Sequence, residues 1–126
     1  MAKLLIVEDD TTLGKAMVDE LTEAGFEVVW AKEANEAFTK LKEGKINLIY
    51  LDIMLPGELD GYEILRKLKQ DGSEYKNIPV VMLSNLGQMK EIDRAMEIGA
   101  SDYVVKANID LSRLVELTKS KTALSQ

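Results

Sequence analysis

The chain has 126 residues with a net charge of −6, and 46% of its residues are hydrophobic and 30% are charged. This composition indicates an ordinary globular domain rather than a disordered or fibrous chain, and the acidic balance argues against direct contact with nucleic acid. The absence of cysteine excludes a disulfide framework and favours a reducing, cytoplasmic location. The segment before the first predicted strand is too short for a signal peptide or a membrane span. We therefore expect one domain over residues 1–126 and no membrane segment.

The first half of the chain alternates predicted strands with predicted helices. Short apolar runs predict strands at residues 3–7 and 27–31. A helix follows each of these strands, and glycines at positions 25 and 44 predict where the two helices end. The apolar residues at helical spacing are Leu13, Ala16, Met17, Leu21 and Ala24 in the first helix, and Ala34, Ala37, Phe38 and Leu41 in the second.

Residues 46–51 form an apolar run without alternation, which is typical of a central strand covered on both faces. Asp52 follows this run directly, and a turn at Pro56 and Gly57 comes next. Open α/β sheets bind their ligands at the carboxyl ends of strands, so Asp52 is the first candidate functional residue.

The second half of the chain keeps the same alternation. Asp60 and Glu63 form a predicted capping box at the start of a third helix. Apolar runs predict strands at residues 78–83 and 103–105, and the helix between them is predicted to end at Gly99. The residues expected on the inner helix faces are Ile64, Leu65 and Leu68, then Met89, Ile92, Ala95 and Met96, and finally Leu111, Leu114, Val115 and Thr118. Residues 123–126 are expected to fray.

Five successive strand–helix units with apolar strands predict an α/β fold with a parallel sheet and helices on both faces. The expected architecture is a flavodoxin-like (βα)5 three-layer sandwich with a five-stranded parallel sheet in the order 2-1-3-4-5. This order makes the first and third strands neighbours. The acidic residues Glu8, Asp9 and Asp10 are therefore expected to lie beside Asp52.

Carboxylates that converge at strand ends repel one another unless a cation or a proton intervenes. Oxygen ligands without histidine or cysteine suit Mg²⁺, and we interpret Asp9 together with Asp52 as a cation site. For Asp10 alone we favour a helix N-cap, and the plain alternative for Glu8 and Asp9 is that both are solvated.

Ser84 and Lys106 follow the fourth and fifth predicted strands. Each alone is more often a cap or a surface residue. Their occurrence at successive strand ends, beside an acidic pair and a lone aspartate, indicates a phosphoryl-transfer site. In such a site, positioning and charge neutralisation carry most of the catalysis.

Five motifs, spread over almost the whole chain, occur in the order and spacing of one known family. They are Ile6-Val7-Glu8-Asp9-Asp10, Leu51-Asp52-Ile53-Met54-Leu55-Pro56-Gly57, Asp60-Gly61-Tyr62-Glu63, Val81-Met82-Leu83-Ser84 and Gly99-Ala100-Ser101-Asp102-Tyr103-Val104-Val105-Lys106. With these motifs the chain resembles the receiver domain of bacterial two-component response regulators, the chemotaxis-protein-like family.

The resemblance implies a role for each matching residue. Asp52 would accept a phosphoryl group from a kinase phosphohistidine. Asp9, Asp52 and the backbone carbonyl of Met54 would hold Mg²⁺, with Glu8 assisting. Ser84 and Lys106 would contact the phosphoryl oxygens. Tyr103 would be the switch aromatic, whereas its spacing alone favours a half-buried strand tyrosine.

The resemblance also implies partners. A sensor histidine kinase or a histidine phosphotransfer protein would supply the phosphoryl group, because this chain contains no histidine. The fourth helix, fifth strand and fifth helix would form the docking face for a downstream target protein or effector domain, and a phosphorylation-dependent homodimer is one form of output. No effector domain is recognised in the sequence, which fits either a stand-alone receiver or a receiver cut from a longer protein.

Four departures from the family pattern affect rates and geometry rather than the core site. Gly57-Glu58-Leu59 adds one residue to a loop, and Asn85 replaces a small residue after Ser84. Met54 and Leu86 are apolar and offer no group to orient a hydrolytic water, which predicts a long-lived phosphoaspartate. Alanine stands where the family usually has proline after Lys106, which predicts a trans Lys106–Ala107 bond.

Two other functions remain as alternatives. An aspartate-nucleophile phosphohydrolase commonly carries a second acid two residues after its nucleophile, and Met54 occupies that position here. A receiver fold that serves as an interaction module without phosphorylation is disfavoured by the intact set Asp9, Asp52, Ser84 and Lys106. We expect a signalling domain rather than an enzyme with turnover.

Overall fold

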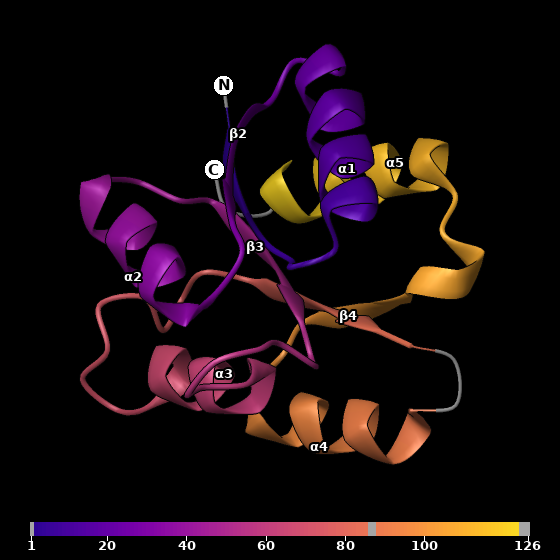
Figure 1. Cartoon of the computed structure of the whole chain (residues 1–126). Helices are drawn as coiled ribbons and strands as arrows, with labels where there is room; N and C mark the ends of the chain where they lie inside the picture. The colour runs from indigo at the N-terminus through magenta and orange to yellow at the C-terminus, as the bar shows by residue number, and fades with distance from the viewer. Residues whose placement is uncertain (1, 86–87, 124–126) are drawn as a thin grey trace.

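The computed structural model of the chain describes residues 2–85 and 88–123. Five parallel strands form one sheet in the order β2-β1-β3-β4-β5, which confirms the predicted flavodoxin-like topology (Figure 1). The strands are β1 (Lys3–Val7), β2 (Glu27–Ala31), β3 (Leu48–Asp52), β4 (Val80–Ser84) and β5 (Asp102–Val105).

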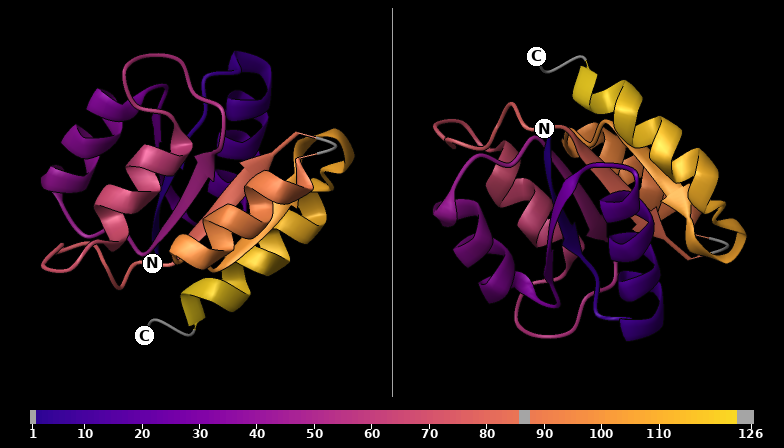
Figure 2. Two further views of the ribbon diagram at one scale, coloured as in Figure 1. Left: turned by 90° about the horizontal axis from the view of Figure 1, so that it is seen from below. Right: turned by 90° about the horizontal axis from the view of Figure 1, so that it is seen from above.

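Helices cover both faces of the sheet (Figure 2). Helices α1 and α5 pack on one face, and α2, α3 and α4 pack on the other. Their bounds are α1 (Thr11–Glu23), α2 (Ala34–Glu43), α3 (Gly61–Lys69), α4 (Met89–Ile98) and α5 (Leu111–Ala123), with a short 3₁₀ turn, η1 (Lys106–Asn108), after β5. In the described part of the chain, no helix combines the length and apolar character needed to cross a membrane.

The two hydrophobic cores explain why the central strands are apolar throughout. Alternate residues of β1 point to opposite faces, so Leu4 and Ile6 contact the α1 and α5 side while Leu5 and Val7 contact the other side. All of β3 and β4 is buried in the same way, including Asp52 and Ser84 at their carboxyl ends. The fold therefore places two polar side chains at the carboxyl edge of the sheet, at the ends of two strands that are otherwise apolar and buried.

Strands β3, β4 and β5 each differ from the predicted ranges by one or two residues, and the starts of β3 and β4 have a local explanation. Strand β3 begins at Leu48 rather than at residue 46, because the Asn47 side chain accepts a hydrogen bond from the backbone of Lys3 at 2.8 Å. Strand β4 begins at Val80, after Pro79, which lacks an N–H group for the ladder. The stretch predicted to fray is described only as far as Ala123, which ends α5, and residues 124–126 lie outside the described residues.

The predicted inner faces of the last two helices are only partly correct. Ile92 and Ala95 are buried, but Met89 and Met96 have exposed fractions of 56% and 40%. In α5, Leu114 and Thr118 are buried while other positions of the predicted face are only half-buried. The helical period was recognised correctly, but α4 contacts the core along a narrower stripe than its apolar residues suggest.

The start of α3 is fixed against the end of β3. The predicted capping box is present, since Asp60 accepts from the Glu63 backbone at 3.1 Å and Glu63 accepts from the Asp60 backbone at 3.3 Å. The backbone N–H of Gly61 donates to Ile53 O at 3.0 Å, and a methyl group at this position would overlap the carbonyl oxygen of Asp52. Glycine is needed here so that the helix can approach the strand end that carries Asp52.

Candidate functional site

The site lies at the carboxyl edge of the sheet, where β1 and β3 are neighbours. Val7 and Leu51 are paired in the β1–β3 register, so Glu8 and Asp52 follow side by side. Both residues are almost completely buried. Two neighbouring carboxylates that are buried away from solvent need a compensating positive charge or a bound proton.

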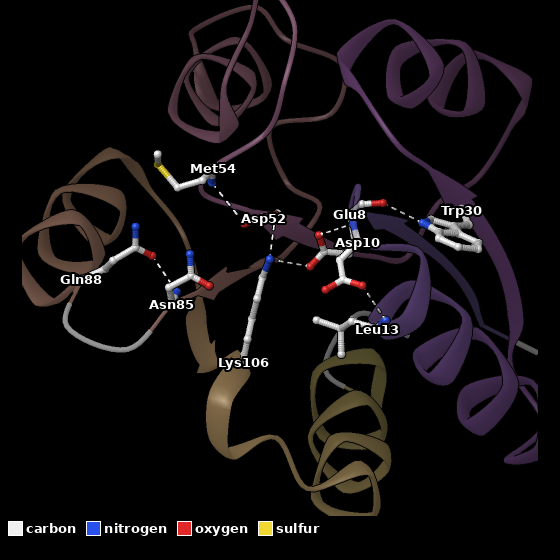
Figure 3. Close-up of polar contacts among 9 residues, drawn as sticks. All are labelled: Glu8, Asp10, Leu13, Trp30, Asp52, Met54, Asn85, Gln88 and Lys106. Carbon is white, nitrogen blue, oxygen red and sulfur yellow. Dashed lines mark hydrogen bonds and ion pairs between the residues drawn. The ribbon is translucent and has the colours of Figure 1, made fainter.

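Lys106 supplies a positive charge between these carboxylates (Figure 3). Its Nζ lies 2.7 Å from Glu8 Oε1 and 2.7 Å from Asp52 Oδ2. The lysine directly follows β5, and its side chain is 16% exposed. The sequence placed Lys106 at a strand end beside the acidic residues, and the structure confirms this position through its contact with Asp52.

The second oxygen of each carboxylate accepts a backbone hydrogen bond. Asp52 Oδ1 accepts from Met54 N at 3.1 Å, and Glu8 Oε2 accepts from Asp10 N at 3.0 Å. Asp10 in turn caps α1, since its Oδ1 accepts from Leu13 N at 3.1 Å, which confirms the N-cap interpretation. The acids are thus held in place by the loops that follow their own strands.

Burial changes the acid–base properties of the cluster. Desolvation by burial, with a smaller contribution from the neighbouring Asp52 carboxylate, raises the pKa of Glu8 to about 7, although the hydrogen bonds from Lys106 and from the Asp10 backbone oppose this rise. Desolvation alone would lower the pKa of Lys106, but the hydrogen bonds and charges of Asp52 and Glu8 outweigh it, so the pKa is raised. Lys106 therefore stays charged at neutral pH.

Asp9 completes an acidic cluster with Glu8 and Asp52. One oxygen from each of the three carboxylates can be chosen so that all three lie within 4.8 Å of one another. Asp9 is exposed, and within residues 2–85 and 88–123 no hydrogen bond or ion pair holds its carboxylate. Three carboxylates and one ammonium leave an excess of two negative charges when all are ionised. An all-oxygen donor set with this excess fits a divalent hard cation such as Mg²⁺.

Ser84 lies at the end of β4 and is completely buried. Among the described residues its Oγ has no hydrogen-bond partner. Buried hydroxyl groups are normally satisfied, so an unpartnered one at a strand end is unusual and is suited to an acceptor that arrives later.

The other predicted site residues lie at the edge of this cluster or outside it. Met54 contributes its backbone N–H to Asp52, while its side chain is 57% exposed. Tyr103 lies within β5 and is 39% exposed, so it is not part of the acidic cluster. The loop with the extra residue is at the surface, with Gly57 at a positive φ of 97°.

The loops around the cluster bear on two further predictions. Asn85 is exposed, and its backbone N–H donates to Gln88 Oε1 at 2.6 Å. The prediction for Leu86 lies outside the described residues. No cis peptide bond occurs among the residues that the structure describes, so Lys106–Ala107 is trans as predicted.

Sequence reasoning missed one residue that contacts the acidic loop from a neighbouring strand. The indole Nε1–H of Trp30, on β2, donates to the backbone carbonyl of Glu8 at 2.9 Å. The only available signal was that the chain's single tryptophan stands near the end of a strand.

Comparisons with known proteins agree with this geometry. The family model described as "Response regulator receiver domain" matches residues 4–119. The chain is 40% identical over 104 residues to the transcriptional regulatory protein CusR of Escherichia coli K12, covering 82% of this chain and 44% of that protein. It is 36% identical to the probable transcriptional regulator ycf27 of Cyanophora paradoxa, covering 82% of this chain and 41% of that one. The chain thus spans less than half the length of these curated relatives.

Solved structures show the same fold. A putative response regulator from Chloroflexus aurantiacus superimposes with a TM-score of 0.88 at 31% identity, covering 97% of this chain and 98% of that one. NtrX from Brucella abortus gives a TM-score of 0.90 at 28% identity, covering 99% of this chain and 28% of that one.

Proposed function

Because the chain belongs to the response regulator receiver domain family, we propose that Asp52 accepts a phosphoryl group from a phosphohistidine. The donor would be a sensor histidine kinase or a histidine phosphotransfer protein of a two-component system. The observation that carries this proposal is the buried Asp52 carboxylate, which contacts the Lys106 ammonium and lies within an acidic cluster.

In the proposed reaction an Asp52 oxygen forms a bond to phosphorus while the P–N bond of the phosphohistidine breaks. The bonding electron pair goes to the imidazole nitrogen, which takes up a proton and leaves as neutral histidine. Lys106 would remain near the phosphoryl oxygens and offset their negative charge. The unpartnered hydroxyl of Ser84 would donate a hydrogen bond to one of those oxygens.

We assign the Mg²⁺ site to Asp9, Asp52 and the backbone carbonyl of Met54, with Glu8 assisting. The acidic donor set and its excess negative charge support this assignment. When bound, Mg²⁺ would supply positive charge for the transferring phosphoryl group. Autodephosphorylation would use the same residues with water as the acceptor.

The proposed output is a change on the surface formed by α4, β5 and α5. Phosphorylation would draw the Ser84 hydroxyl toward the phosphoryl group, and the exposed Tyr103 ring would move into the space that is vacated. A downstream target protein or an effector domain would read this surface, and a phosphorylation-dependent homodimer is one form of that output. The match covers only 41–44% of the transcriptional regulators CusR and ycf27, so each of these relatives has a large further part, which supports an effector partner.

We further propose that residues 1–126 act as a single receiver domain in the cytoplasm, without direct contact with nucleic acid or membrane. The lack of cysteine supports the cytoplasmic location, and the net charge of −6 supports the absence of direct contact with nucleic acid.

The proposal is tested by incubating the protein with acetyl phosphate and MgCl₂ and measuring its intact mass. We expect one added phosphate on the wild type, none on Asp52→Asn, and none when EDTA replaces MgCl₂. Steady release of inorganic phosphate from small phosphate esters would instead indicate a phosphohydrolase. An unmodified wild type would indicate an interaction module that does not use phosphorylation.

A further inference from the structure

Both backbone polar groups of Glu8 form hydrogen bonds with residues at the end of β2. The Glu8 N–H donates to the Ala31 carbonyl at 3.0 Å, which continues the β1–β2 ladder by one residue. The Glu8 carbonyl accepts from the Trp30 indole at 2.9 Å (Figure 3). The Glu8 N–H is therefore bound by backbone, whereas the Glu8 carbonyl is bound by the Trp30 side chain. The orientation of the peptide between Glu8 and Asp9 thus depends on Trp30.

The indole of Trp30 packs against Gly14 of α1 and lies near Lys32, and these neighbours keep it in this orientation. Gly14 of α1 is buried, and a methyl group there would overlap the six-membered ring of the indole. The Lys32 ammonium lies 5.1 Å from the ring centroid. The ring is therefore confined by α1 and contacted by a cation, and its N–H is held toward the Glu8 carbonyl.

The backbone of the acidic loop is then fixed on both sides of Asp9. Before Asp9, the Glu8 carbonyl is bound by Trp30, and after it, the Asp10 N–H donates to the Glu8 carboxylate at 3.0 Å. The Asp9 carboxylate itself has no partner among the residues that the structure describes. The loop thus holds the Asp9 backbone while leaving its carboxylate open to a ligand.

We infer that Trp30 is a positioning residue that aims the Glu8 and Asp9 carboxylates at a divalent cation through its hydrogen bond to the Glu8 carbonyl. This inference rests on the proposed Mg²⁺ site. Trp30 does not touch the cation, and it acts by limiting the orientations that the loop samples before the cation binds, which strengthens binding. Gly14 contributes to this positioning because its lack of a side chain leaves space for the indole.

The test replaces Trp30 with β-(3-benzothienyl)alanine, which keeps the bicyclic shape but has sulfur in place of the N–H group. Because the chain has one tryptophan, global replacement changes this position only. Mg²⁺ affinity is measured by isothermal titration calorimetry, and the thermal midpoint in EDTA serves as the measure of structural damage. The encoded variant Trp30→Phe provides a second protein without the indole donor.

We expect the analogue to raise the Mg²⁺ dissociation constant roughly threefold to tenfold, the range set by one hydrogen bond. The thermal midpoint in EDTA should change little. Gly14→Ala, which displaces the ring, should weaken Mg²⁺ binding by a similar factor in the tryptophan protein and produce no further weakening in the analogue.

The possible failures are distinguishable. An analogue and a Trp30→Phe variant that both bind Mg²⁺ as tightly as wild type would overturn the role of Trp30 and leave the Mg²⁺ site intact. A lower thermal midpoint with unchanged Mg²⁺ affinity would show that Trp30 serves packing alone. A wild type that binds no Mg²⁺ would overturn both this inference and the proposed metal site.

Discussion

Lys106 Nζ lies 2.7 Å from Asp52 Oδ2, although 54 positions separate the two residues in the sequence. The same nitrogen lies 2.7 Å from Glu8 Oε1, so one ammonium serves two buried carboxylates. This sharing makes Lys106 a structural cation in the resting protein as well as the proposed partner of the phosphoryl group.

Replacing Lys106 with methionine should therefore reduce stability in the absence of Mg²⁺. Removing the ammonium leaves two buried carboxylates without a cation, and we expect the free energy of unfolding to fall by about 3 kcal/mol. Lys121→Met is the matched control, because Lys121 forms a longer ion pair of 3.5 Å with the more exposed Asp102. This control should lose less than about 1 kcal/mol. Urea unfolding of both variants in EDTA measures the difference, and equal losses would contradict the structural role of Lys106.

Ser84→Ala should leave the protein at least as stable as the wild type. The Ser84 hydroxyl is buried with no partner among the described residues, so its removal should change the free energy of unfolding by between zero and about 1 kcal/mol in favour of the folded state. Thr118→Val is the contrast, because the Thr118 hydroxyl donates to Leu114 O at 2.7 Å and bonds to Tyr50 at 2.6 Å. If Ser84→Ala destabilises the protein as much as Thr118→Val, the hydroxyl has a structural partner and is not reserved for a phosphoryl oxygen.

Much of this arrangement could be predicted from the sequence, because it depends on strand order. Once five apolar strands are placed in the order 2-1-3-4-5, the residues that follow them must meet at one edge, which is why Glu8, Asp52 and Lys106 were expected together. The capping box at Asp60 and the N-cap at Asp10 are local patterns and were also predictable.

Apart from the approach of Lys106 to Asp52, contacts between side chains on different elements could not be predicted. The hydrogen bond from Trp30 to Glu8 needs a particular side-chain orientation and the space left by Gly14, and neither follows from periodicity. The double contact of Lys106 and the complete burial of Glu8 likewise depend on three-dimensional packing. Met89 and Met96 were placed inside because apolar spacing does not show how wide a stripe of α4 contacts the core.

The burial of the Tyr50 hydroxyl predicts a loss of stability in strongly alkaline solution. Burial raises the pKa of Tyr50 from 10.0 to about 12, with the Thr118 hydrogen bond opposing this rise. Between these values the unfolded chain releases a proton that the folded protein keeps, so rising pH favours unfolding. Stability from this group is fully present below pH 10 and declines through pH 12.

Tyr50→Phe isolates this effect because all other titrating groups are unchanged. The variant should be about 1 kcal/mol less stable than wild type at pH 8, since it lacks one buried hydrogen bond. The difference should shrink as pH rises above 10 and approach zero or reverse near pH 12. Denaturant unfolding across this pH range is the measurement, and a constant difference would show that Tyr50 titrates alike in both states.

Met54→Gln should shorten the life of the proposed phosphoaspartate. The Met54 side chain is exposed beside Asp52 and has no group that can orient a water molecule. A glutamine amide could position that water, and we expect dephosphorylation to accelerate by about threefold to tenfold. The decay of phosphorylated protein after removal of the phosphodonor gives the rate. Met89→Gln, an exposed methionine on α4, is the control and should leave the rate unchanged.

The central claim is that Asp52 carries the phosphoryl group, and borohydride trapping tests it most directly. Protein treated with acetyl phosphate and MgCl₂ is reduced with sodium borohydride, which converts a phosphorylated aspartate into homoserine, and peptide mapping by mass spectrometry locates the change. The account predicts homoserine at position 52 alone, dependent on both phosphodonor and Mg²⁺. Homoserine at position 9 or 10 with an unchanged Asp52 would contradict it.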